Sequence, residues 1–138
     1  MKKMIFLVVD DCGGSRTILQ GTVQDYCKDR MIECDILTAP NGKEAAEILN
    51  EAYVDVLLTD VIMPYMGGEE LVRLLEIICP SVISIMMTGT EGYEVPEHLD
   101  VEGLLEKPIS EEALYDALDR IVMLFFRDRT MEDSHENN

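Results

Sequence analysis

Residues 57–68 read LLTDVIMPYMGG and contain the feature that decides the fold, an apolar run that ends on a carboxylate. The run VDVLLTD closes on Asp60, and Pro64, Gly67 and Gly68 follow it. A continuous apolar run without polar alternation is typical of a strand covered on both faces, as in a parallel sheet flanked by helices. In such sheets, ligands bind beyond the carboxyl ends of the strands. Asp60 is therefore predicted to project from a strand tip into a binding crevice.

The rest of the chain repeats this alternation of apolar strands and amphipathic segments. Strands are predicted at residues 4–9, 33–38, 54–60, 82–88 and 103–106. Helices are predicted at 15–28, after an N-cap at Asn41, at 69–78, and from an N-cap at Ser110 to about residue 126. After Thr88 the pattern weakens, because two glycines and Pro96 allow at most a short helix around residues 96–99. This order predicts an α/β fold with a parallel sheet and helices on both faces.

The composition is that of one globular domain. The chain has 138 residues, 47% of them hydrophobic and 28% charged, and its apolar runs are too short to cross a bilayer. We expect one domain over residues 1–127 and a polar, disordered tail at 128–138. The net charge of −17 argues against direct nucleic-acid binding, which depends on Lys and Arg. The four cysteines lack metal-ligand spacing and, without an export signal, predict free thiols in a cytoplasmic protein.

Four of the predicted strands end on, or just before, polar residues that could bind a ligand or take part in a reaction. Asp10 and Asp11 follow the first strand, Asp60 ends the third, Thr88 ends the fourth, and Lys107 follows the last. Because parallel strands share one carboxyl edge, these side chains are predicted to meet. Carboxylates gathered in one place repel one another, and oxygen ligands without His or Cys favour Mg²⁺ as the compensating charge. The set suits phosphoryl transfer to an aspartate nucleophile, with the metal and Lys107 neutralising the phosphoryl oxygens.

Each of these residues also has a purely structural explanation. An Asp–Asp pair after a strand is often a helix cap with a solvated neighbour, Asp60 alone can be a loop acid, and Thr88 can be a turn hydroxyl. Lys107 is harder to explain without a partner, because it closes an apolar strand. The joint placement of all of them at strand tips favours the functional interpretation.

Several motifs occur in a fixed order along the chain. They are VVDD at 8–11 with Arg16 five residues after Asp11, APNGKEA at 39–45, DVIMPYMGG at 60–68, MMTG at 86–89 and LLEKP at 104–108. As a set they resemble the receiver domain of two-component response regulators, the CheY-like family. The resemblance implies a single-domain, doubly wound (βα)5 flavodoxin-like fold with strand order 2-1-3-4-5. It also implies a cytoplasmic signalling switch and not an enzyme, since such a domain catalyses only its own phosphotransfer and dephosphorylation.

The resemblance further implies a role for each site residue. Asp60 would be the phosphoacceptor for a phosphoryl group from a sensor histidine kinase or phosphotransfer protein, and Lys107 and Thr88 would contact that group. Mg²⁺ would be held by Asp10, Asp11, Asp60 and the backbone carbonyl of Ile62. A downstream protein target would bind the face formed by the fourth helix, fifth strand and fifth helix, with no direct contact to nucleic acid or membrane.

Two departures from the family pattern leave a second function open. Leu104 stands where the family usually has Tyr or Phe, and the stretch between Thr88 and Lys107 is a few residues short. The alternative is a receiver-like interaction module that works without phosphorylation and has an atypical output face. Two other hypotheses are weaker. An aspartyl phosphatase would need an acid at Ile62, and a flavin carrier would place its phosphate loop after the first strand instead of at TGTEG (88–92).

Overall fold

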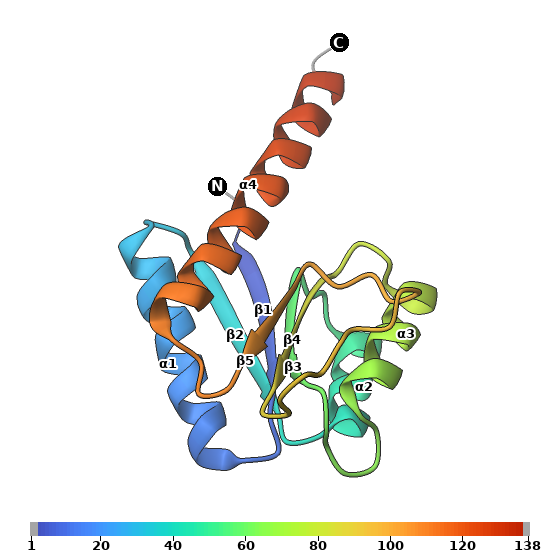
Figure 1. Cartoon of the computed structure of the whole chain (residues 1–138). Coiled ribbons are helices and arrows are strands. Elements are labelled where there is room, and N and C mark those ends of the chain that lie inside the picture. The colour runs from blue at the N-terminus through green and yellow to red at the C-terminus, as the bar shows by residue number, and fades with distance from the viewer. Residues whose placement is uncertain (1–2, 137–138) are drawn as a thin grey trace.

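The computed structural model describes residues 3–136 and the side chains of residues 3–127. Within them, five parallel strands form one sheet and four helices cover its two faces (Figure 1). The elements are β1 (Met4–Val9), α1 (Gly13–Asp29), β2 (Cys34–Ala39), α2 (Gly42–Glu51), β3 (Val56–Asp60), α3 (Gly68–Ile78), β4 (Ile83–Thr88), β5 (Gly103–Glu106) and α4 (Glu111–Glu136). The strand order is β2-β1-β3-β4-β5, which confirms the predicted α/β fold and its 2-1-3-4-5 order.

Two apolar cores, one on each face of the sheet, hold the strands in place. Side chains alternate along β1, so Phe6 and Val8 enter the core shared with α1 and α4, while Leu7 and Val9 enter the core shared with α2 and α3. All four of these side chains are fully buried. Burying each one stabilises the fold by roughly 1.5–3 kcal/mol relative to exposure. The central strands are therefore rigid supports for whatever their tips carry.

Two helix starts agree with the predicted caps. Asn41 Oδ1 accepts a hydrogen bond from the Glu44 N–H at 2.9 Å, and Ser110 Oγ accepts one from the Ala113 N–H at 3.0 Å. Each bond satisfies one of the backbone donors that a helix leaves unpaired in its first turn. The caps fix where α2 and α4 begin.

The last helix is longer than the sequence pattern predicts. The pattern predicts an end near residue 126, but α4 runs to Glu136 and extends beyond the sheet (Figure 1). Residues 127–136 contain neither Pro nor Gly, so no residue there forces the helix to stop. The predicted division between a domain at 1–127 and a disordered tail at 128–138 thus falls inside α4. The described part of that tail is helical, and residues 137 and 138 lie outside the described range.

The crossover from β4 to β5, residues 89–102, is fully described and contains no helix. Around residues 96–99, where the sequence allows at most a short helix, there is a single turn, in which the Leu99 N–H donates to the Pro96 carbonyl at 3.0 Å. Pro96 disfavours the helical conformation at Val95, and Gly92 has a φ of +77°. The predicted output face included a fourth crossover helix, and this part of the prediction is wrong because a loop occupies that place.

The structure also bears on the cysteines and on the apolar segments of the sequence. Cys12, Cys27, Cys34 and Cys79 are free thiols, as predicted. Among the described residues, no helix combines the length and the apolar character that crossing a membrane requires.

Candidate functional site

Asp60 lies at the carboxyl end of β3, a strand whose residues are all buried. It is only 3% exposed, although it carries a carboxylate. The loop after it folds back sharply, since the Gly68 N–H donates to the Val61 carbonyl at 2.8 Å and a Cβ added at Gly68 would overlap the Asp60 carbonyl oxygen. Only glycine allows α3 to begin this close to the strand tip. The position of Asp60 is therefore tightly fixed.

Asp10 and Asp11, which follow β1, form a cluster of three carboxylates with Asp60. One oxygen from each residue lies within 4.8 Å of the other two. Asp10 is buried and Asp11 is exposed. The Cys12 N–H donates to Asp10 Oδ1 at 2.9 Å, and the Arg16 guanidinium donates to the Asp10 carbonyl at 2.7 Å. These two bonds hold Asp10 in position, and the motif match alone did not indicate this role for Arg16.

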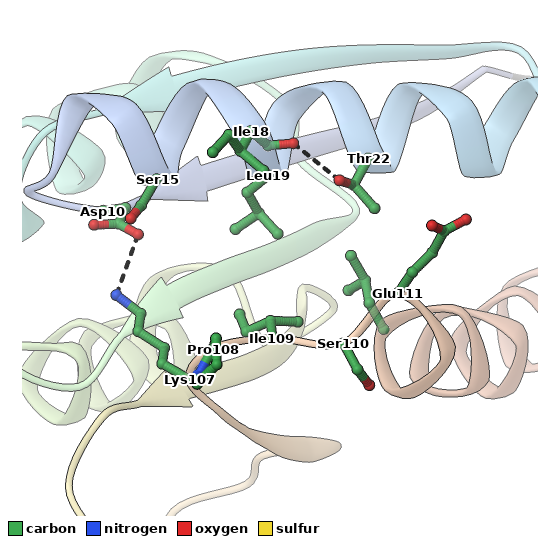
Figure 2. A pocket seen from close by; sticks show the side chains of 11 residues that line it. Asp10, Ser15, Ile18, Leu19, Thr22, Lys107, Pro108, Ile109, Ser110 and Glu111 are labelled. Carbon is green, nitrogen blue, oxygen red and sulfur yellow. Dashed lines mark hydrogen bonds and ion pairs between the residues drawn. The ribbon is translucent and has the colours of Figure 1, made fainter.

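Lys107 supplies the positive charge of the site. Its backbone N–H donates to the Thr88 carbonyl at 2.7 Å, which fixes the end of β5 against β4. Its Nζ lies 2.5 Å from Asp60 Oδ1 and 3.3 Å from Asp10 Oδ2. Figure 2 shows the side chains of Asp10 and Lys107 pointing toward each other from opposite sides of the site. One ammonium cannot neutralise the whole cluster when all its carboxylates are ionised.

The electrostatics of Asp60 follow from this surplus of negative charge. The pKa of Asp60 is raised from 3.8 to about 7, mainly by burial and further by the Asp10 carboxylate, against the opposing effect of Lys107. Burial lowers the pKa of Lys107, but Asp60 and Asp10 outweigh this effect and the net shift is upward. Within the described residues, Asp60 Oδ2 has no hydrogen-bond donor, and Oδ1 meets Lys107 as an ion pair without hydrogen-bond geometry. Such a carboxylate is poised to accept a further positive group.

The remaining predicted site residues lie around this cluster. Thr88 is buried at the end of β4, and its Oγ1 accepts a hydrogen bond from the Thr90 N–H at 3.0 Å. Leu104 in β5 pairs with Met86 in β4, so this position of the sheet holds no aromatic side chain. Ile62 is 72% exposed in the loop after Asp60 and directs an apolar side chain into solvent.

A groove of about 700 Å³ between α1 and α4 extends away from the site. Asp10 and Lys107 lie at one end of it, while Ile18, Leu19 and Leu114 are among the residues that line it (Figure 2). The adjacent residues Ile18 and Leu19 are the feature of the sequence that could have indicated this groove. Two adjacent large apolar residues on an amphipathic helix cannot both face the core, and Ile18 is 72% exposed.

Comparison with known proteins identifies the family. The family model described as "Response regulator receiver domain" matches residues 6–119. The chain belongs to this family. Receiver domains are signalling domains of two-component systems, so the resemblance noted in the motifs is confirmed.

The relatives found by these comparisons are similar over most of the domain. A response regulator receiver protein of Anaeromyxobacter is 35% identical over 85 residues, which are 59% of this chain and 36% of that protein. The transcriptional regulatory protein NatR of Bacillus subtilis is 32% identical over 111 residues, which are 72% of this chain and 48% of NatR. The solved structure of the chemotaxis protein CheY4 of Vibrio cholerae is 29% identical with a TM-score of 0.73, covering 87% of this chain and 99% of that one. The chain spans between 12% and 52% of the length of the curated relatives compared.

The carboxylate oxygens of the cluster are suitable ligands for a magnesium ion. Receiver domains bind Mg²⁺ at an acidic pocket, and here Asp10, Asp11 and Asp60 form such a pocket. Mg²⁺ prefers oxygen ligands and uses few protein carboxylates besides water and phosphate oxygens. Asp60 Oδ2, which no donor satisfies within the described part of the chain, is an oxygen that a cation would satisfy.

Proposed function

We propose that the chain is a phosphorylatable signalling switch in which Asp60 accepts a phosphoryl group from a phosphohistidine of a sensor histidine kinase or phosphotransfer protein. The observation that carries this proposal is the buried Asp60 carboxylate, whose Oδ1 lies 2.5 Å from Lys107 Nζ and whose Oδ2 has no donor among the described groups. Membership in the receiver family supports it, because such domains work with histidine kinases or phosphotransfer proteins.

The transfer exchanges one bond to phosphorus for another. A carboxylate oxygen of Asp60 attacks the phosphorus while the P–N bond to the partner's histidine ring breaks. The electron pair of that bond stays on the ring nitrogen, which can then take a proton. Lys107 and Thr88 provide the ammonium and the hydroxyl that interact with the phosphoryl oxygens as charge spreads over them. The product is an acyl phosphate on Asp60.

Asp10, Asp11, Asp60 and the backbone carbonyl of Ile62 would hold Mg²⁺. When bound, the ion supplies positive charge beside the phosphoryl oxygens. Asp10 is kept in place by the Cys12 N–H and by Lys107, while the exposed Asp11 faces the solvent from which a hydrated ion enters. Because the pKa of Asp60 is raised to about 7, an added positive charge would lower it and favour the nucleophilic carboxylate at neutral pH.

The groove between α1 and α4 offers the phosphodonor partner a surface next to the reacting carboxylate. It begins at Asp10 and Lys107 and continues over Ile18 and Leu19. An apolar surface that opens directly beside the charged site would let a partner bury area while presenting its phosphohistidine to Asp60.

The test is direct labelling of the whole chain with phosphoramidate, a small donor with a P–N bond. In the presence of Mg²⁺, we expect intact-mass and peptide analysis to find one phosphoryl group, located on Asp60. Asp60→Asn should abolish labelling, whereas Asp35→Asn, which changes an exposed carboxylate of β2, should not affect it. Labelling that persists in Asp60→Asn would contradict the proposal, and so would unlabelled native protein under conditions that label a known receiver domain.

A second candidate function is an interaction module that works without phosphorylation. Leu104 and the helix-free crossover at 89–102 favour it, because both alter the region through which the family signals. This function predicts that Asp60→Asn and the native chain bind the downstream partner equally well, with or without phosphodonor. Binding that changes only when Asp60 is labelled would exclude it.

A further inference from the structure

A hydrogen-bonded turn connects the Thr88 hydroxyl to Tyr93 in the crossover between β4 and β5. The Thr90 N–H donates to Thr88 Oγ1 at 3.0 Å, and the Tyr93 N–H donates to the Thr90 carbonyl at 3.4 Å. The second bond is long and correspondingly weak, so the turn depends mainly on the first. The backbone at Tyr93 is thus linked to the orientation of one hydroxyl in the site.

The side chain of Tyr93 packs over the same face of the sheet as Thr88. Alternation along β4 places Met86 and Thr88 on one face, and Leu104 pairs with Met86 from the neighbouring strand. Tyr93 and Leu104 both pack against the core that lies between this face and helices α2 and α3. The aromatic side chain that β5 lacks is therefore supplied to this core by the crossover.

The phenol of Tyr93 is buried without a completed hydrogen bond among the described groups. Burial raises the pKa of Tyr93, and the carboxylate of Glu69, in the first turn of α3, adds to the rise. Glu69 is thus close to the phenol, but it does not reach the geometry of a full hydrogen bond. A buried hydroxyl in this state is disfavoured relative to one in water, which offsets part of the stabilisation that Tyr93 gains by packing its ring against the core.

We propose that Tyr93 reports the state of Asp60. When the Thr88 hydroxyl turns to a phosphoryl group on Asp60, it releases the Thr90 N–H, the turn at residues 90–93 opens, and Tyr93 leaves the core. This inference rests on the proposed phosphorylation of Asp60. Leu104 in β5 has no aromatic ring that could change position with the state of Asp60. The crossover then supplies the aromatic side chain that responds.

The surface that this movement changes is negatively charged. The crossover has no Lys or Arg and carries five exposed acids, which are Glu91, Glu94, Glu97, Asp100 and Glu102. Opening of the turn would rearrange these carboxylates. A partner that reads the change should therefore present a basic surface.

A simpler explanation is that Tyr93 is a fixed anchor that holds the crossover against the core in every state. Both explanations predict that Tyr93→Ala lowers stability, so stability alone does not separate them. They differ in whether residues 89–102 respond when Asp60 is modified.

The first experiment measures hydrogen exchange of the whole chain with Mg²⁺, before and after labelling with phosphoramidate. We expect amides in 89–102 to exchange about fivefold faster after labelling, the change that loss of one hydrogen bond of about 1 kcal/mol produces. The occupancy of Asp60 is read from the intact mass of the same sample.

The second experiment uses tryptophan as a reporter, since the native chain has none. Tyr93→Trp should show a red-shifted emission and stronger quenching by acrylamide after labelling. The control is Tyr53→Trp at a site that is already 63% exposed, and its emission should not change. In the Tyr93→Trp background, Thr88→Val should remove the response per labelled molecule, and Thr88→Ser should restore it.

The outcomes separate this inference from the proposed function. No mass increase on Asp60 would overturn both. Full labelling with unchanged exchange in 89–102 and unchanged emission at position 93 would overturn the role of Tyr93 and leave phosphorylation of Asp60 standing. An undiminished response in labelled Thr88→Val would also overturn it, because the hydroxyl would then not carry the signal.

Discussion

The tip of β3 and the crossover after β4 meet at the same edge of the sheet, but they differ in how closely the chain is packed. A Cβ added at Gly68, beside Asp60, would overlap a backbone oxygen, whereas one added at Gly89, beside Thr88, would meet nothing within 4 Å. β3 is buried throughout, and the crossover is mostly exposed. The residues proposed to react are therefore held rigidly, and the segment proposed to respond has room to move.

This difference matches what each part has to do. Phosphoryl transfer requires nucleophile and cation to stay within a few tenths of an ångström of a productive arrangement, which buried strand tips provide. A readout requires a segment with two positions of similar free energy. The following predictions test whether the two regions really divide these tasks, beginning with the change that should have the largest effect.

Lys107→Ala removes the ammonium that pairs with Asp60 and Asp10. We expect the initial rate of phosphoramidate labelling to fall by about 100-fold or more, the usual loss when a charge-stabilising group is removed. The Asp60 pKa should also rise, because Lys107 opposes the effects of burial and of Asp10. Intact-mass spectrometry against time measures the rate, and Lys43→Ala, at an exposed position of α2, should label normally. If the labelling rate falls by less than about threefold, a group other than Lys107 must neutralise the phosphoryl oxygens.

Gly68→Ala tests the packing beside Asp60 directly. The added Cβ would overlap the carbonyl of a buried strand that cannot shift freely, so we expect the free energy of unfolding to fall by about 3 kcal/mol. Gly89→Ala, with open space around the new methyl group, should change it by no more than about 0.5 kcal/mol. Urea denaturation followed by circular dichroism gives both values. Equal losses would mean that the crossover is as constrained as the strand tip.

The same contrast explains how much could be predicted from the sequence. The parallel sheet and the meeting of Asp10, Asp11, Asp60 and Lys107 at one edge were predictable from the residues, because buried parallel strands have a distinctive apolar pattern and a fixed geometry at their carboxyl ends. The strand order followed only from the resemblance to the receiver family. Parallel strands at these positions leave few possible arrangements of the side chains at their tips.

The crossover and the last helix were less predictable. Residues 89–102 have no clear periodicity, and their path depends on Tyr93 and Leu99 packing against a core made by other elements. The sequence pattern predicts too short an α4, because the polar composition of residues 128–138 is typical of a tail, although no Pro or Gly between 127 and 136 stops the helix. The path of the crossover depends on tertiary contacts, which have no local sequence pattern. The sequence of residues 127–136 lacks a stop signal, but its polar composition fits a solvated helix as well as a tail.

The pH dependence of stability should report the burial of Asp60. Its pKa is raised from 3.8 to about 7 in the folded protein, so the folded state binds a proton more readily than the unfolded state between these values. Stability in the presence of a chelator should then decrease as pH rises from about 4 to 7, by about 2 kcal/mol after allowance for solvent screening, and level off above that. Urea midpoints across this range measure the slope. Asp60→Asn should show a smaller slope, and the same slope in both proteins would show that Asp60 is not the titrating group.

The smallest expected effect concerns the lifetime of the phosphorylated state. Ile62 stands two residues after Asp60 and is 72% exposed, and its side chain has no group that can hold an attacking water. We expect the acyl phosphate in Ile62→Asn to decay about threefold faster than in the native chain, because an amide can orient water near the phosphorus. The decay is followed by intact mass after removal of the donor.

Ile77→Asn, at an exposed apolar position of α3, is the matched control and should decay like the native chain. Because Ile62 is exposed, its substitution should leave the free energy of unfolding unchanged, so a faster decay would show that the loop after β3 tunes the reaction without disturbing the rigid tip. If native protein decays as fast as Ile62→Asn, water reaches the acyl phosphate by a path that does not pass this side chain. The rigid tip of β3 would then determine the lifetime without help from its loop.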